Sequence, residues 1–187
     1  MARRRARAGY FEPVPGGGAA IALDEVEISI LRSLAVQLLE LIGPGDQPAG
    51  ADEDPLAALF AEGPTKPPED PALARLFPDA YEESGDAAEF RRFTENDMRA
   101  RKREDALAMV RVLDSGGPVL KLTPGEARQW LGGLNDLRLT IGTRLEVTED
   151  ENDELFHLAD DDPRKPLVMA YLWLGGLQES LVEALMS

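Results

Sequence analysis

The residues best suited to metal chemistry are the carboxylates of one acidic tract. Residues 146–162 contain nine Asp or Glu side chains and no Lys or Arg. Hard cations such as Ca²⁺ bind clustered carboxylate oxygens. The tract nevertheless lacks the glycine that a calcium loop needs at its turn, so it is better interpreted as a solvated acidic loop between two helices. We expect no metal and no cofactor, and a metal- or small-ligand-binding helical protein remains an alternative.

A second metal-like pattern is Glu154-Leu-Phe-His157, which has the Glu-x-x-His spacing of di-iron helical bundles. Those bundles use two histidines, and this chain has one. Cysteine is absent, which excludes disulfides, thiolate zinc sites and cysteine nucleophiles within these 187 residues. Phosphate-loop, dinucleotide and serine-nucleophile motifs are also missing. The sequence therefore predicts a non-enzymatic protein, with a carboxylate-only site as the remaining form that catalysis could take.

The pentapeptide Trp-Leu-Gly-Gly-Leu occurs twice, at 130–134 and 173–177, and each copy is followed by an amide and a carboxylate. Glycine weakens a helix interior, so paired glycines need a reason. One interpretation is close packing of the last two long helices; the other is a notch for a ligand or partner. The polar residues near the two copies are the candidate partner-binding residues: Asn135, Asp136, Arg138, Arg144, Gln178 and Glu179.

Two groups of cations suggest a DNA-binding transcriptional regulator as another alternative. One is an arm at the start of the chain, and the other lies in the middle of a long helix. The net charge of −15 opposes broad contact with nucleic acid, and carboxylates interleave with the second group. The candidate nucleic-acid-binding residues are Arg3, Arg4, Arg5, Arg7, Arg99, Arg101, Lys102 and Arg103.

The elements that must position these residues are mostly helical. Apolar periodicity predicts four long helices, at 24–42, 86–114, 124–147 and 163–186. Capping boxes begin the first three of them, namely Asp24 with Glu27, Asp86 with Glu89, and Thr123 with Glu126. Shorter helical turns are expected near 54–61 and 71–77.

Strands are few and short. Residues 8–23 resemble a hairpin around glycines 16–18, and 119–122 form another strand candidate. The segments 21–27 and 120–126 both follow the order strand, cap, helix, which suggests that the two strands pair. We therefore expect a mostly α fold, a helical bundle with a small β-hairpin or three-stranded sheet at one end.

The chain reads as one domain. Residues 1–9 are predicted to be a disordered basic arm, and 10–187 a single helical domain with a proline-rich loop at 43–71. No apolar stretch follows the arginine arm, so a signal peptide is not expected. No run is long and apolar enough to span a membrane. A cytoplasmic location is the expectation.

Several segments resemble an actinobacterial family called domain of unknown function 2017. They are Leu31-Arg-x-Leu-x-x-Gln-Leu-Leu-Glu40, Arg75-Leu-Phe-Pro-Asp-Ala-Tyr81, Glu89-Phe-Arg-Arg-Phe-Thr-Glu95, Leu134-Asn-Asp-Leu-Arg138 and Trp173-Leu-x-x-Leu-Gln-Glu-Ser-Leu181. The resemblance implies a cysteine-poor, cytoplasmic helical protein, and it favours a regulatory or adaptor role. Taken together, we expect a non-enzymatic interaction or regulatory protein that binds another protein, or a second copy of itself, and neither nucleic acid nor membrane.

Overall fold

The computed structural model describes residues 8–44, 63–149 and 154–187. This part of the chain is mostly α-helical with one small sheet, as the sequence predicted. Its elements are β1 (Glu12–Val14), β2 (Gly18–Ala22), α1 (Glu25–Ile42), α3 (Pro71–Leu76), α4 (Ser84–Asp114), β3 (Val119–Leu122), α5 (Pro124–Arg144), the short 3-10 helix η1 (Glu154–His157) and α6 (Lys165–Leu185). The predicted turn at 54–61 and the arginine arm at 1–7 lie outside the described residues.

The sheet joins strands that are distant in sequence. Its order is β1-β2-β3, and both pairings are antiparallel. Ile21 pairs with Leu120, which confirms the predicted pairing of the two strand–cap–helix segments. Gly16 and Gly17 turn the hairpin with φ angles of 99° and 87°, a region that glycine enters without steric cost. The chain before Glu12 also joins this sheet, because Gly9 donates a backbone hydrogen bond of 3.0 Å to Ala22. Residues 8 and 9 therefore do not belong to a free arm.

Two of the three predicted capping boxes are present. Asp24 accepts from the backbone N–H of Glu27 at 2.8 Å, and Glu27 accepts from Asp24 at 2.9 Å. Thr123 and Glu126 make the same reciprocal pair at the start of α5. The third prediction was wrong. α4 begins at Ser84 after Glu83, which makes no side-chain cap, so the Asp86–Glu89 pair lies inside the first turns of the helix.

The helix ends also differ from the expected bounds. α5 ends at Arg144 rather than near 147, because Glu146 adopts a left-handed φ of 56° and Val147 donates back to the carbonyl of Gly142 at 3.0 Å. α6 covers Lys165–Leu185, slightly inside the predicted 163–186. The short helix expected near 71–77 is α3, capped by the carboxylate of Asp70.

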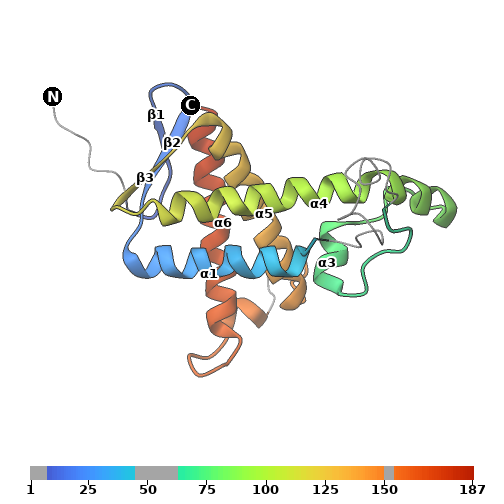
Figure 1. The fold of residues 1–187 in the computed structure, drawn as a ribbon. Helices are drawn as coiled ribbons and strands as arrows, with labels where there is room; N and C mark the ends of the chain where they lie inside the picture. Colours follow the sequence, from blue (N-terminus) through green and yellow to red (C-terminus); the bar gives the residue numbers. More distant parts are fainter. Residues whose placement is uncertain (1–7, 45–62, 150–153) are drawn as a thin grey trace.

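The long helices form two layers that cross (Figure 1). α1 and α4 lie side by side in the front layer and run in opposite directions, while α5 and α6 cross behind them. The sheet lies at the end where α1 begins and α4 finishes. At the other end α4 continues past the end of α1 toward α3 and its adjoining loop.

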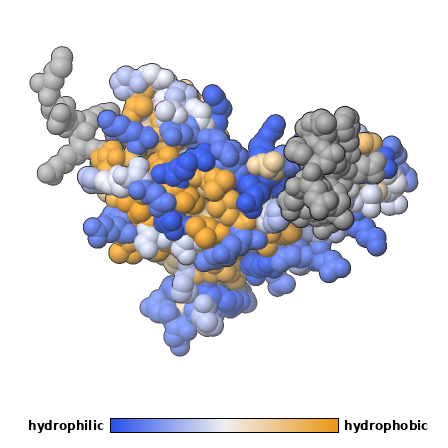
Figure 2. Space-filling view, in the orientation of Figure 1, coloured by the Kyte–Doolittle hydropathy of each residue, from blue (hydrophilic) through white to orange (hydrophobic). Residues whose placement is uncertain are grey.

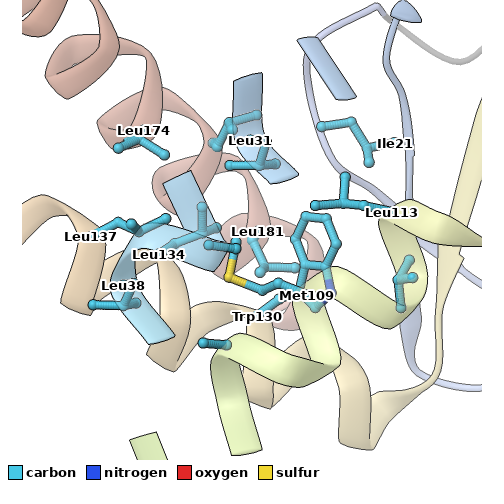
Figure 3. Close-up of a cluster of buried hydrophobic side chains, with 14 of the residues drawn as sticks. Ile21, Leu31, Leu38, Met109, Leu113, Trp130, Leu134, Leu137, Leu174 and Leu181 are labelled. Atoms are coloured by element: carbon cyan, nitrogen blue, oxygen red, sulfur yellow. The ribbon is translucent and has the colours of Figure 1, made fainter. Parts of the chain in front are cut away.

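All four long helices and the sheet contribute to one core (Figure 3). Its largest side chain, Trp130 of α5, is fully buried and packs edge-on against Phe11 with ring centroids 5.9 Å apart. Figure 3 also labels Leu134 and Leu137 of α5 and the contributions of the other elements, which are Ile21, Leu31, Leu38, Met109, Leu113, Leu174 and Leu181. Burial of each of these Leu, Ile and Met side chains stabilises the fold by roughly 1.5–3 kcal/mol.

The face shown in Figure 2 is hydrophilic toward its ends, with hydrophobic residues near the centre, over α1 and α4. Across the described residues, every helix is too short or too polar to cross a lipid bilayer.

Candidate functional site

The α5 copy of the repeated pentapeptide packs against α4. A Cβ added at Gly133 would collide with the sulfur of Met109, and one added at Gly132 would collide with the carboxylate of Asp105. Both glycines therefore leave room for α4 side chains. The interpretation that the glycines pair the last two long helices was wrong for this copy.

The α6 copy has a different environment. A Cβ added at Gly176 would meet nothing within 4 Å, and one at Gly175 would make only ordinary contact with Arg138, 3.5 Å from its Nε. No contact within the described residues therefore requires Gly176, although glycine in a helix interior costs about 1 kcal/mol relative to alanine. Trp173 is half-buried, unlike Trp130.

These α6 glycines lie in a hollow of about 800 Å³, which we call the α6 hollow; it is lined by Arg138, Leu172, Gly175, Gly176, Gln178, Glu179, Val182 and Glu183. The hollow contains three of the predicted partner-binding residues. Arg138 of α5 donates to the amide oxygen of Gln178 at 2.8 Å, and its guanidinium lies over the ring of Tyr171 at 5.4 Å. Glu179 is exposed at the rim.

The other three predicted partner-binding residues lie apart. Asn135 is exposed, whereas the Asp136 side chain is only 3% exposed and accepts from Lys102 of α4 at 2.7 Å. Arg144 is exposed and pairs with Asp70 at 2.6 Å, which ties the end of α5 to the start of α3. The structure thus does not place the six residues on one surface, and Asp136 is a buried packing residue.

The Lys102–Asp136 pair forms a small titratable cluster with Asp105 where α4 meets α5. Burial raises the pKa of Asp105 to about 6, and the nearby carboxylate of Asp136 acts in the same direction. Burial also raises the pKa of Asp136, while the hydrogen bond from Lys102 opposes the rise. This cluster serves the helix joint, since Asp136 is buried where α4 meets α5 and the half-buried carboxylate of Asp105 lies beside Gly132 of α5.

Three of the four α4 cations predicted to contact nucleic acid are directed into the protein. Arg99 is buried and donates to the last carbonyl of α1, that of Ile42. Arg103 donates to the carbonyl of Leu39 at 3.2 Å, and Lys102 pairs with Asp136. Arg101 alone of the four is exposed. The predicted basic patch is therefore not assembled in this part of the chain.

The middle of α4 instead contains a buried row of charges. Glu95 is 3% exposed and accepts from Arg91 at 2.7 Å on one side and from Arg99 at 2.9 Å on the other. Arg91 also donates to the carbonyl of Phe77 at 3.0 Å, and Arg99 lies over the ring of Phe77 at 4.7 Å. The interleaved cations and carboxylates of this segment did not indicate in the sequence that any of them would be buried. The charges are buried because two parts of the chain pack against α4 here. These are the end of α1, at Ile42, and the segment that follows α3, at Phe77.

The N-terminal part of α4, before Arg99, extends past the end of α1. We call these residues, 84–98, the α4 overhang. Phe93 is 61% exposed, and Phe90 packs edge-on against Tyr81 at 5.7 Å while both remain exposed. A mainly apolar groove of about 280 Å³ runs along it, lined by Phe77, Pro78, Asp79, Ala80, Ala87, Phe90, Arg91, Thr94, Glu95 and Met98. The sequence analysis did not identify this groove; Phe90 lines it, whereas Phe93 lies beside it on the overhang.

The metal-like patterns do not assemble into a site where the structure describes them. His157 is exposed at the end of η1, and the described part of the chain contains no group of three or more metal-ligating side chains. Asp160 and Asp162 pair with neighbouring Lys165 and Arg164. Residues 150–153 of the acidic tract lie outside the described residues.

Comparison with known proteins gives a consistent assignment. Residues 5–185 match the family model described as "Domain of unknown function (DUF2017)". The chain is 30% identical over 175 residues to the "Oxidative stress regulator AosR" of Mycobacterium tuberculosis (strain H37Rv), covering 86% of this chain and 78% of that protein. It is equally similar to the "Putative oxidative stress regulator AosR" of Mycobacterium leprae, with 86% and 79% covered. No solved structure matches. Because the family model spans all of the helices and strands described above, this chain belongs to the DUF2017 family.

Proposed function

We propose that this protein is a non-enzymatic cytoplasmic regulator that acts by binding a partner protein through the α4 overhang. The observation that carries the proposal is the exposed apolar groove on the α4 overhang, the part of α4 that extends past the end of α1. Relatives named as oxidative stress regulators support the regulatory part. Large aromatic side chains at an exposed groove are the usual anchors of protein interfaces.

The chemistry of the overhang favours a particular kind of partner segment. Asp86 and Glu89 line a second hollow with Tyr81, Phe90 and Phe93, so apolar and acidic side chains alternate there. A helix or extended segment with apolar side chains flanked by Lys or Arg complements this surface in shape and charge.

The proposed role differs from a thiol switch. The chain contains no cysteine, so its part in any oxidative stress response must use chemistry other than disulfide formation between its own side chains. Binding to a regulatory partner meets that requirement.

The test uses a photo-crosslinking amino acid at Phe93 in host cells. We expect one dominant crosslinked protein, lost when Phe90→Asp is added and retained when Val26→Asp is added. Val26 is a matched control, because it is 65% exposed on α1. A purified partner identified in this way should bind the wild-type chain and fail to bind Phe93→Asp.

The opposite result would remove the α4 overhang from the mechanism. That result is a crosslink pattern unchanged by Phe90→Asp, or equal binding of wild-type and Phe93→Asp chains, with circular dichroism showing both variants folded. Complementation provides a second readout: a host lacking this chain should recover normal peroxide-dependent transcript levels with Val26→Asp and not with Phe93→Asp.

A further inference from the structure

We propose that this chain forms a two-fold dimer in which α6 crosses α6 of a second copy at Gly175 and Gly176. The proposal goes beyond the partner-binding function and uses a different surface. Gly176 has open space where a Cβ would stand, whereas both glycines of the α5 copy face side chains of α4. A helix that displays unoccupied glycines can be approached closely by another backbone, and a crossing helix fits that space.

Apolar side chains extend along α6 on both sides of this notch. Met169 is 57% exposed and Leu172 is 48% exposed before the glycines, and Val182 and Met186 are exposed after them. At 3.6 residues per turn, Leu172 and Met186 lie near the middle of one broad face, and Met169 and Val182 lie toward its two edges. Exposed apolar side chains grouped on one face, here interrupted by Glu179 and Glu183, are typical of a surface that packs against another protein.

The sequence of α6 makes this face suited to a copy of itself. Leu172 and Glu179 lie at equal distances along the helix from the midpoint between Gly175 and Gly176, and so do Met169 and Val182. In an antiparallel two-fold pair, each residue faces its counterpart across that midpoint. The arrangement places Leu172 of one copy over the methylene groups of Glu179 of the other, with Met169 and Val182 flanking the crossing.

Charge complementarity supports the same occupant. Arg138, which lines the α6 hollow, forms no ion pair within the described residues, and its buried Nε–H has no acceptor there. Glu179 lies at the rim of the hollow. In the dimer, Glu179 of the second copy lies opposite Leu172, about one helical turn from Gly175 of the first copy. Arg138 of the first copy lies beside that glycine. Each copy thus supplies an anion for the cation of the other.

The first test measures mass against concentration by sedimentation equilibrium. A single helix crossing buries less than the roughly 1,200 Å² of a standard interface, so the measurement must extend to about 1 mM. We expect the mass to rise toward twice 20.4 kDa. Leu172→Glu should weaken association at least about tenfold, because it sets two carboxylates against each other. Val26→Glu, a matched exposed site on α1, should leave it unchanged.

The second test fixes the register, using the absence of native cysteine. Leu172→Cys and Glu179→Cys are prepared as separate chains, mixed and oxidised. The two-fold crossing predicts disulfide dimers mainly in the mixture, and Val26→Cys mixed with either chain should not crosslink above the level of random collision.

These outcomes decide the proposal. A chain that remains monomeric up to about 1 mM would overturn it, and so would a dimer that persists in Leu172→Glu or lacks the mixed crosslink. Loss of dimerisation in Leu172→Glu with retained partner capture at Phe93 would leave the proposed function standing, so the two can fail independently.

Discussion

Glycine has opposite consequences at the two copies of Trp-Leu-Gly-Gly-Leu, and substitution can separate them. Gly133→Ala places a methyl group against the buried Met109, and overpacking of about 1–3 kcal/mol should exceed the helix-propensity gain of about 1 kcal/mol, so we expect a net loss in unfolding free energy. Gly176→Ala adds a methyl group in open space, so the monomer should gain up to about 1 kcal/mol from helix propensity. Urea unfolding followed by circular dichroism at micromolar concentration measures both changes. Equal effects at the two positions would contradict the assigned orientations of the two helices.

Asp105 gives the joint between α4 and α5 a pH dependence. Its folded-state pKa of about 6 lies above the value of an unfolded Asp, so the folded state holds the proton more tightly. Its contribution to stability is complete below the unfolded pKa and is lost as the pH rises from about 4 through 6.

The isosteric variant Asp105→Asn removes this titration. We expect it to flatten the stability curve between about pH 4 and 6 and to stabilise the protein at pH 7.5 by about 1 kcal/mol, a figure reduced because the side chain is only partly buried. Thermal melts across that pH range provide the measurement, with Asp97→Asn on the exposed face of α4 as the control. A wild-type curve with no decline in this window would show that the pKa of Asp105 is not raised.

At the scale of elements, the buried charges attach the α4 overhang to the rest of the protein. Glu95→Gln would leave the buried Arg99 without a carboxylate and Arg91 with only the exposed Asp79, and we expect a loss of about 3 kcal/mol. Glu104→Gln breaks an exposed pair with Arg111 and should cost less than about 1 kcal/mol. Denaturant unfolding gives these values. Hydrogen exchange should show faster opening of residues 84–98 in the Glu95 variant alone; similar costs for both variants would argue that the charge row is not buried.

Elements were predictable from the sequence where their cause is local. The capping boxes of α1 and α5 and the pairing of β2 with β3 follow from short patterns, and the structure contains them. The Asp86–Glu89 pair has the same pattern, but the helix begins two residues earlier, at Ser84. A cap motif in the sequence does not show how the preceding chain approaches the helix, so this start could not be predicted. The periodicity of α5 places Gly132 and Gly133 on a face without identifying the helix that covers it. For the same reason the inward direction of Arg99 and Lys102 was not evident, and the candidate site was only partly predicted.

For the whole molecule, the distribution of charge predicts weak binding to DNA. Three of the four α4 cations are engaged internally, and the net charge is −15. We expect fluorescence anisotropy with a labelled duplex at 150 mM salt to show a Kd weaker than about 100 μM. Removing residues 1–7 should abolish any binding seen at low salt, whereas Arg101→Ala should change it little. Sub-micromolar binding with a steep salt dependence would revive the DNA-binding alternative.

The difference in burial between Trp130 and Trp173 gives the molecule two optical reporters. Trp130 is fully buried and its indole N–H has no hydrogen-bond partner within the described residues, an environment close to a hydrocarbon solvent. Trp173 is half-buried on α6. Their fluorescence should therefore separate: Trp130 emits at shorter wavelength and resists quenching by acrylamide, while Trp173 emits nearer the red and is quenched. Single replacement of each tryptophan by phenylalanine would assign the two components and give separate optical signals from the core and from α6.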